Sequence, residues 1–442
     1  MPRPAPVLAA LLVLVAAAML PAQLRAQGEP LRIEITEGVE RPMPIALRFE
    51  DAGNAGAVSA GITAVIAADL EGTGLFEIVT PENVPQTRFD RVVDYIGWKS
   101  AETEALVTGT VSVTETTVTI RFRLFDIFAG QPLGDGMQFD APREGWRRAA
   151  HKVADQIYAR ITGETPYFDS RIAFVGESGP ATERVKRIGI MDYDGANVKW
   201  LTPSDDLVLS PRFSPDGRMV LYTSFASGLP QIMAMNVATV TPAPLTSDPH
   251  AMSFAPRFSP DGRWIAFSRE ANGNTDIWIM EVANPAFAKP LTLGPAIDTA
   301  PSWSPDGQRI VFESDRSGSS QLYVMRADGS GPTRISFGGD GAAYGEPSWS
   351  PRGDRIAFTR HDAQGAGIGI MRPDGSGERM LTTGGRDGGP SWAPNGRVMI
   401  FTRIRAEDGQ AQLHSVDIAG RNMRLVTSED AASDPAWGPL LP

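Results

Sequence analysis

A seven-residue phrase containing two prolines recurs through the second half of the chain. Its clearest copy is Pro301-Ser-Trp-Ser-Pro-Asp-Gly307. Five related copies, the last of them cut short after its second proline, begin at Pro211, Pro256, Pro347, Pro390 and Pro435. From one copy to the next the leading prolines are 45, 45, 46, 43 and 45 residues apart. A repeat of this length, rich in strand and turn residues, is typical of the blades of a β-propeller.

Each repeat predicts four short strands. The first is the phrase itself, bracketed by its prolines, and an Asp-Gly or Asn-Gly turn usually follows it. The segments Arg171–Val175, Arg187–Met191 and Lys199–Thr202 match strands two to four of a repeat, but no such phrase precedes them. The truncated copy Pro435–Pro439 supplies the missing strand. We therefore predict a six-bladed propeller over residues 169–442, closed by a C-terminal strand.

Aromatic side chains occupy one fixed place in the repeat, two residues after each leading proline. These residues are Phe213, Phe258, Trp303, Trp349, Trp392 and Trp437. Large apolar rings at one repeated position favour packing between neighbouring blades. An aromatic cage around a ligand is the alternative interpretation.

Residues 27–162 have a different pattern, in which helical and strand periods are mixed. Helices are expected over 57–70 and 143–161, a helical turn over 89–96, and strands over 31–35, 75–79, 105–113 and 118–128. The first strand either pairs within its own domain or adds to the sheet edge of a partner. The fold class is therefore α+β, a small N-terminal α/β domain joined to the propeller by a linker over residues 163–168.

The first 26 residues are typical of a secretory signal. Arg3 supplies a positive start, Val7–Leu20 is apolar, and Ala26 offers a small residue before the expected cleavage. A membrane anchor is the alternative, but the apolar run is shorter than the ~20 residues that a spanning helix needs. We expect an exported protein that is not embedded in a membrane.

Composition argues against several classes of function. There is no cysteine, which excludes disulfides and thiol catalysis. The net charge of −11 argues against nucleic-acid binding, which requires a basic surface. The chain has four histidines, and His151, on the second predicted helix, is expected to be structural or on the surface. No cofactor, metal site or catalytic residue is expected.

An enzyme is the second hypothesis. The G-x-S-x-G nucleophile motif of the serine hydrolases that accompany some propellers is absent from the sequence. A hydrolase with a metal in the central channel would need acidic or histidine side chains converging at one mouth. Candidates by position are Asp298, Glu346, Asp387 and Asp434.

Four features in this order support a family resemblance. They are the signal segment, the early strand Leu31-Arg-Ile-Glu-Ile-Thr-Glu-Gly38, the small α/β domain, and six Ser-Pro-Asp-Gly-type repeats ending in Pro435-Ala-Trp-Gly-Pro439. The sequence resembles the TolB family, periplasmic propeller proteins of the Tol–Pal system of Gram-negative bacteria. Arg352 and Asn395 depart from the repeat, since they replace the aspartate of its turn.

The resemblance implies a periplasmic scaffold and not a catalyst. Such proteins bind the peptidoglycan-associated lipoprotein Pal at one mouth of the propeller and TolA through the mature N-terminus. The system is implied in outer-membrane integrity and in invagination of the outer membrane at division, and colicins or phage proteins are possible further partners.

The resemblance also implies two sets of partner-binding residues. The Pal-facing set, expected in loops just before the first strands, is Met252, Ser253, Phe254, Ala255, Asp298, Thr299, Ala300, Tyr344, Glu346, Asp387 and Asp434. Within it, Ala255 and Thr299 fall where the Pal contacts of the family lie. The TolA-binding set is Leu31, Ile33, Ile35, Glu37 and Val39.

Overall fold

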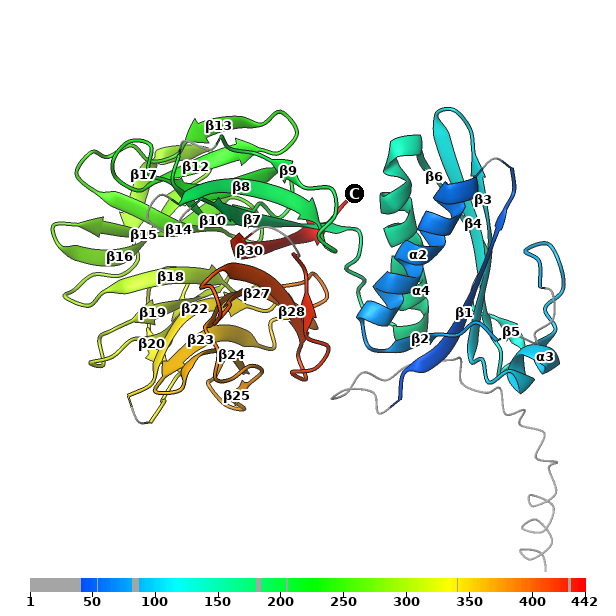
Figure 1. Ribbon diagram of the computed structural model, residues 1–442. Helices are drawn as coiled ribbons and strands as arrows, with labels where there is room; N and C mark the ends of the chain where they lie inside the picture. The colour runs from blue at the N-terminus through cyan, green and yellow to red at the C-terminus, as the bar shows by residue number, and fades with distance from the viewer. Residues whose placement is uncertain are drawn as a thin grey trace, which may run out of the picture.

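The computed structural model describes residues 41–53, 55–81, 87–179, 184–203, 206–339, 341–427 and 431–442. The expected signal segment and the early strand over residues 31–35 lie outside the described residues. The described chain has two parts, an N-terminal part from β1 to α4 and a propeller from β7 to β30 (Figure 1). Among the described residues, no helix is long and apolar enough to cross a membrane.

A mixed sheet forms the side of the N-terminal part that faces away from the propeller (Figure 1). Its strands are β1 (Met43–Asp51), β2 (Phe76–Ile78), β3 (Ala105–Val113), β4 (Thr117–Asp126), β5 (Gln131–Pro132) and β6 (Met137–Pro142). The order is β2-β1-β3-β4-β5, with β6 also paired to β4, and β1 runs parallel to both of its neighbours. The strand β1 was not predicted, because prolines such as Pro42 and Pro44 are typical of a break between elements. Pro44 lies near the start of the strand, where a missing N–H is tolerated.

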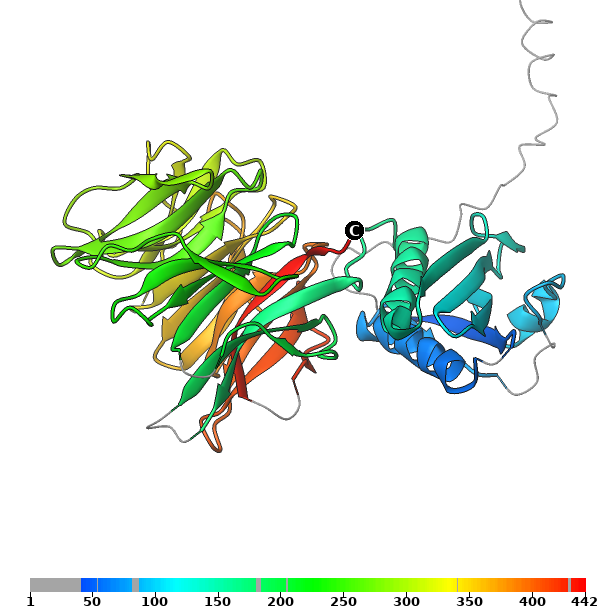
Figure 2. The same ribbon diagram turned by 90° about the horizontal axis from the view of Figure 1, so that it is seen from above.

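Two helices lie between this sheet and the propeller (Figure 2). The helical elements are α2 (Gly56–Gly72), α3 (Tyr95–Ser100), the 3₁₀ turn η1 (Arg143–Gly145) and α4 (Trp146–Thr162). Gly163 ends α4 at φ 70°, a left-handed cap that glycine adopts without strain. The helical turn expected over 89–96 is displaced toward the C-terminus, because the helix begins only at Tyr95, where the Asp94 carboxylate accepts the N–H of Gly97.

The core of the N-terminal part lies between these helices and the sheet. Ile62 and Ile66 of α2 and Ile157 of α4 are fully buried against Ile120 and Phe122 of β4. Their spacing along the helices is the apolar stripe that the sequence shows, so the expected pair of helices is confirmed.

After α4 the described residues form six four-stranded sheets, the blades of a propeller (Figure 1). Blade 1 comprises β10 (Val208–Phe213), β11 (Met219–Ser224), β12 (Gln231–Asn236) and β13 (Thr241–Pro244). Blade 2 comprises β14 (Met252–Phe258), β15 (Trp264–Ala271), β16 (Asn274–Glu281) and β17 (Asn284–Pro290). Blade 3 comprises β18 (Asp298–Trp303), β19 (Arg309–Ser314), β20 (Gln321–Arg326) and β21 (Thr333–Arg334). Blade 4 comprises β22 (Ala343–Trp349), β23 (Ile356–Asp362), β24 (Gly365–Met371) and β25 (Arg379–Met380). Blade 5 comprises β26 (Asp387–Trp392), β27 (Val398–Ile404), β28 (Ala411–Asp417) and β29 (Arg424–Leu425). Blade 6 comprises β30 (Ala431–Leu440), β7 (Ser170–Ser178), β8 (Val185–Asp192) and β9 (Lys199–Trp200).

The split blade is confirmed. The C-terminal strand β30 is the first strand of blade 6 and pairs antiparallel with β7, with Ala436 opposite Ala173 and Trp437 opposite Ile172. The truncated sixth copy of the phrase therefore closes the ring and covers the β7 edge, which would otherwise be unpaired.

The first strand of a blade does not coincide with the phrase bracketed by prolines. In blade 3 the strand begins at Asp298, three residues before Pro301, and its register shifts between Thr299 and Ser302. The first proline thus sits inside the strand at a bulge, a place where the sheet does not need its N–H. The second half of the phrase is a tight turn, in which Gly307, at φ 69°, donates to the Ser304 carbonyl.

The repeated aromatics pack between blades, as predicted. Trp303 of blade 3 is 9% exposed, and its indole N–H donates to the Arg257 carbonyl of blade 2 at 3.3 Å. Trp392 of blade 5 is 6% exposed and donates in the same way to the Ser348 carbonyl of blade 4 at 2.9 Å. Rings buried in this manner are not available as a ligand cage.

Candidate partner-binding face and domain interface

The residues expected at the Pal-facing mouth do not lie in loops. They occupy the first halves of the innermost strands β14, β18, β22, β26 and β30, up to and including the bulge in each strand. The expectation that these residues lie in loops was therefore wrong. These residues are held by strand pairing at the inner edge of each blade, so any partner would meet a rigid surface.

A ring of left-handed residues marks this end of the propeller. In every blade the residue before the leading proline has positive φ: Ser210 (53°), Ala255 (50°), Ala300 (51°), Glu346 (50°), Gly389 (64°) and Asp434 (49°). A residue before proline avoids the helical region, and residues other than glycine avoid the left-handed one. Each non-glycine position stores about 1–3 kcal/mol of strain, a feature that clusters at binding sites.

Polar side chains of the preceding blade hold this ring in place. The N–H of Ala300 donates to the Ser268 hydroxyl at 3.0 Å, and the N–H of Asp434 donates to the Thr402 hydroxyl at 3.0 Å. The N–H of Gly389 donates to Thr359 in the same manner, and that of Glu346 to the Glu313 carboxylate. None of these four acceptors was predicted from the sequence. Their signal was present, because each is the polar residue that follows the phenylalanine of the second strand in its blade.

Two of the predicted aspartates are buried and neutralised by arginine. Asp298 is 1% exposed and accepts two bonds from Arg316, at 3.0 and 2.8 Å. Asp387 is 1% exposed and accepts two bonds from Arg403, both at 2.7 Å. Bidentate pairs of this kind orient the strand ends. Neither carboxylate is free to converge on a channel metal, which weakens the hydrolase alternative.

The remaining predicted residues divide by exposure. Ser253 and Tyr344 are buried, and the Tyr344 hydroxyl donates to Glu378 at 2.8 Å. The side chains that a partner can reach, partly or fully exposed, are Met252, Phe254, Ala255, Thr299, Ala300, Glu346 and Asp434. This set combines apolar, small and acidic side chains on one rim, which suits recognition of a protein surface.

Two arginines missed by the sequence analysis lie near the propeller axis. Arg212 and Arg257 follow the leading prolines of blades 1 and 2 and are partly buried. Burial lowers the pKa of both guanidinium groups, and the charge of Arg212 lowers the pKa of Arg257 further, whereas Glu346 and Asp434 oppose the shift. Glu346 belongs to blade 4, across the ring, so these charges face one another around the axis. The sequence does distinguish these two arginines, because the later blades carry Ser or Ala after the leading proline.

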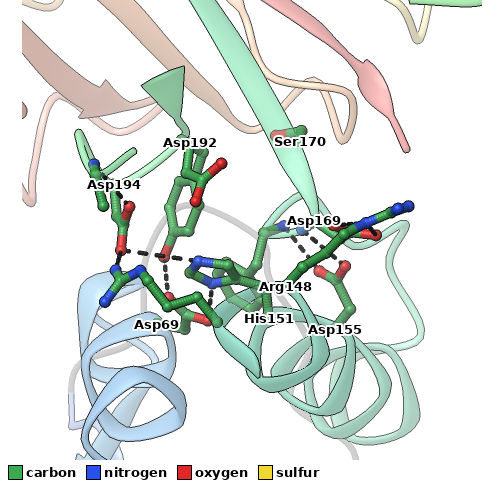
Figure 3. Close-up of polar contacts among 12 residues, drawn as sticks. Asp69, Arg148, His151, Asp155, Asp169, Ser170, Asp192 and Asp194 are labelled. Atoms are coloured by element: carbon green, nitrogen blue, oxygen red, sulfur yellow. Dashed lines mark hydrogen bonds and ion pairs between the residues drawn. The ribbon is translucent and has the colours of Figure 1, made fainter. Parts of the chain in front are cut away.

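A second group of polar residues lies where the N-terminal part meets the propeller (Figure 3). His151 of α4 bonds to Asp69 of α2 at 2.7 Å, and the hydroxyl of Tyr193, which follows β8, donates to the same carboxylate at 2.6 Å. Burial opposes a charge on His151, but the bond to Asp69 and the charges of Asp69 and Asp194 outweigh it and raise its pKa. His151 is 2% exposed, so the surface alternative for this residue is wrong.

Asp155 of α4 fastens the segment that leads into the propeller (Figure 3). Its carboxylate accepts the backbone N–H groups of Tyr167 at 3.1 Å, Phe168 at 2.8 Å and Asp169 at 3.0 Å. Asp155 is 5% exposed, and burial raises its pKa to about 7 despite these bonds. The same segment is held on its other side by Glu164, which accepts bonds from Arg352 of blade 4 and Arg397 of blade 5.

Aromatic rings complete this interface. Tyr167 packs at 4.5 Å from Phe168, 5.7 Å from Tyr193 and 5.8 Å from Trp437, measured between ring centroids. Each such pair contributes about 0.5–1.5 kcal/mol beyond the area it buries. The segment between α4 and β7 is thus buried, hydrogen-bonded and ring-packed, so it connects the two parts as a stiff joint.

Fold and site together define a six-bladed propeller with a strained inner rim and a firmly attached α/β part, an arrangement suited to a binding scaffold. A family model described as the TolB beta propeller domain matches residues 158–441, and one described as the TolB amino-terminal domain matches residues 31–133. The first match covers more than half of the chain. The chain belongs to the TolB family.

Relatives agree with this assignment. The Tol-Pal system protein TolB of Roseobacter denitrificans is 52% identical over 229 residues, or 51% of this chain and 52% of the relative. That of Dinoroseobacter shibae is 54% identical over 241 residues, or 53% of this chain and 54% of the relative. The chain spans about half the length of the curated relatives it matches. The crystal structure of TolB from Acinetobacter baumannii is similar at a TM-score of 0.79 and 27% identity, covering 92% of this chain and all of that one.

Proposed function

We propose that this protein is a non-enzymatic periplasmic scaffold of the Tol–Pal system, which binds the lipoprotein Pal through the propeller rim and TolA through the mature N-terminus. The observation that supports it best is the ring of left-handed residues at the inner strand ends. A closed propeller holds this strained rim without rearrangement, so little conformational entropy is lost when a partner docks.

Pal would meet the exposed part of the rim. Met252 and Phe254 of blade 2 supply apolar contact, Ala255 and Thr299 leave room for a partner's side chains, and Glu346 supplies charge. The buried members Asp298, Asp387, Tyr344 and Ser253 act indirectly, because they hold the strands on which these side chains stand. A small cluster of well-held contacts of this type is what carries most of the energy in protein interfaces.

TolA would bind the segment before β1. Leu31, Ile33, Ile35, Glu37 and Val39 lie outside the described residues, and their alternating pattern suits addition of a strand to a partner's sheet. With residues 1–26 removed as a signal, this segment stands at the start of the mature chain. The proposed division is then an N-terminal domain over 27–162, a linker over 163–168 and the propeller over 169–442.

In the cell this scaffold would connect the two partners and so support outer-membrane integrity and invagination of the outer membrane at division. Pal is a lipoprotein and TolA an inner-membrane protein, so the two sites would serve partners on opposite sides of the periplasm. Colicins or phage proteins would be further partners.

A pair of substitutions within one hairpin tests the Pal site. Thr299→Arg places a long charged side chain on the rim, whereas Gln308→Arg places it on an exposed residue at the opposite end of the β18–β19 hairpin. We expect Thr299→Arg to weaken binding of purified Pal by at least tenfold in calorimetry and Gln308→Arg to leave it unchanged. Equal affinity for all three proteins would contradict the proposed site.

A further inference from the structure

A buried histidine at the domain interface has one ring nitrogen unused. His151 is 2% exposed, and its Nδ1 lies 2.7 Å from the Asp69 carboxylate (Figure 3). Its other nitrogen, Nε2, is buried and has no hydrogen-bond partner among the described residues. Nε2 lies 3.8 Å from Oδ2 of Asp194, on the turn between β8 and β9. A buried nitrogen without a hydrogen-bond partner is destabilising, so its place opposite a carboxylate needs a reason.

The surroundings fix which nitrogen can act as a ligand. Asp69 accepts at both oxygens, from the Tyr193 hydroxyl at 2.6 Å and from His151 at 2.7 Å. A neutral His151 therefore carries its proton on Nδ1 and presents the lone pair of Nε2 toward Asp194. A carboxylate that accepts the N–H of one imidazole nitrogen orients a histidine so that its other nitrogen can bind a metal ion. In this protein the other nitrogen faces the Asp194 carboxylate.

We propose that Nε2 of His151 and the Asp194 carboxylate bind one divalent transition-metal ion of the zinc class, which links the N-terminal part to the propeller. Asp69, His151 and Asp194 each place a ligand atom within 4.8 Å of the others. Two ligand atoms of a tetrahedral zinc ion are roughly 3.4 Å apart, so the 3.8 Å separation closes with a small side-chain movement. An imidazole ligand favours zinc, copper or nickel over calcium and magnesium.

A cavity next to the site gives a metal ion its route and its remaining ligands. The cavity has a volume of 630 Å³ and is lined by His151, Arg147, Asp192 and Asn197, among others. Water from the cavity would complete the coordination. Site and entrance thus both lie on the seam between the two parts of the chain.

Arg147 makes the proposal sharper, because it competes for the same carboxylate. Its guanidinium group pairs with Oδ2 of Asp194, and its Nε is buried without a hydrogen-bond partner among the described residues. The positive charge of this arginine repels a metal ion held by the same oxygen. Removing the arginine charge must therefore strengthen metal binding, an effect opposite to that of removing a residue with a merely structural role.

The ion would act as a cross-link. His151 and Asp69 come from α4 and α2, whereas Asp194 belongs to blade 6, so binding would oppose rotation of one part against the other. This inference is independent of which partners the rim and the N-terminal segment bind. It also goes against the sequence-based expectation that the chain holds no metal.

Zinc and cobalt titrations of the full mature chain test the proposal. For the unmodified protein we expect one zinc ion per chain by calorimetry, and the visible absorption of tetrahedral Co²⁺ when cobalt is used. His151→Gln and Asp194→Asn should abolish this stoichiometric binding. Asp69→Asn should weaken it about 10–100-fold, the usual cost of losing the group that orients a ligand. Arg147→Gln should tighten it.

Two controls keep the outcome decisive. His250 is exposed, so His250→Gln should leave the affinity unchanged. Asp194 is also exposed, so Asp194→Asn should fold even if a substitution at buried His151 does not, and a thermal melt checks this. Absence of binding to the unmodified chain, or equal binding to a folded Asp194→Asn protein, would overturn the proposal.

Discussion

The indole N–H of Trp437 donates a hydrogen bond to the Ser170 hydroxyl at 2.8 Å and so joins the closing strand β30 to the first residue of β7. Trp437 also packs against Tyr167 and Tyr193, at centroid distances of 5.8 and 6.3 Å. The Trp437 side chain thus contacts three regions: the first residue of β7, the segment between α4 and β7, and Tyr193 beside α2.

Deleting residues 433–442 should open the ring. Without β30 the β7 edge is unpaired and the apolar faces of blades 5 and 6 are exposed, so we expect a large fall in the melting temperature by calorimetry. Trp437→Ala should cost about 3–5 kcal/mol. Trp437→Phe, which keeps a ring but removes the N–H, should cost about 1 kcal/mol. Unchanged unfolding of the truncated chain would contradict the closure described here.

Substitutions at the left-handed rim positions should change the stability of the protein differently from the same substitutions at ordinary strand positions. Ala300 lies at φ 51°, so Ala300→Val forces a β-branched residue into a strained region and should destabilise the protein by about 1–3 kcal/mol. Ala300→Gly should be neutral or slightly stabilising, since glycine adopts this conformation freely. Ala243→Val, at an exposed strand position, should change stability by less than about 0.5 kcal/mol. Urea denaturation measures all three, and equal effects of Val at positions 243 and 300 would be evidence against strain.

Asp155 should make stability depend on pH between about 4 and 7. Its folded-state pKa of about 7 lies above the ordinary value of 3.8, so the folded protein holds a proton that the unfolded chain releases. This contribution is fully present below pH 3.8 and is lost as the pH rises through 7. The slope in the window between is at most roughly 1.4 kcal/mol per pH unit. Asp155→Asn should remove that slope from the pH dependence of unfolding, whatever its effect on stability at one pH. A slope that survives the substitution would assign the titration to another group.

Deletion of residues 27–36 should separate the two proposed partner sites. We expect the shortened chain to lose binding to TolA, because the strand it would add to the partner is gone, and to keep its affinity for Pal. Thr299→Arg should show the reverse pattern. Binding assays with each purified partner check both, and loss of both partners on deletion would refute separate sites.

The repeat predicted more of the fold than of the site. Its spacing and its truncated last copy were sufficient for the number of blades and for closure by β30, because both depend on local patterns that recur. The strand β1 was not predicted because proline usually interrupts a strand. Pro44 lies near the start of β1, where proline is tolerated.

The contacts of the rim residues could not be predicted from local sequence patterns. Asp298 looked like a loop residue open to a partner, but it is paired with Arg316, which follows the neighbouring strand β19 at the same end of the hairpin. The bond from Ala300 to Ser268 joins two blades and depends on how they stack around the ring. His151 was one helix position among many until folding brought Asp69 and Asp194 to its two nitrogens.

The pairing of β30 with β7 has a consequence for how the chain reaches its native state. Trp437 and Ser170 are 267 residues apart in sequence. Bringing together ends so far apart costs roughly 3 kcal/mol more loop entropy than closing a ten-residue hairpin. Blade 6 should therefore form last and slowly, as expected for contacts of high sequence separation. Until it does, β7 presents a bare sheet edge, and this late step is where newly made chains would aggregate or need a chaperone.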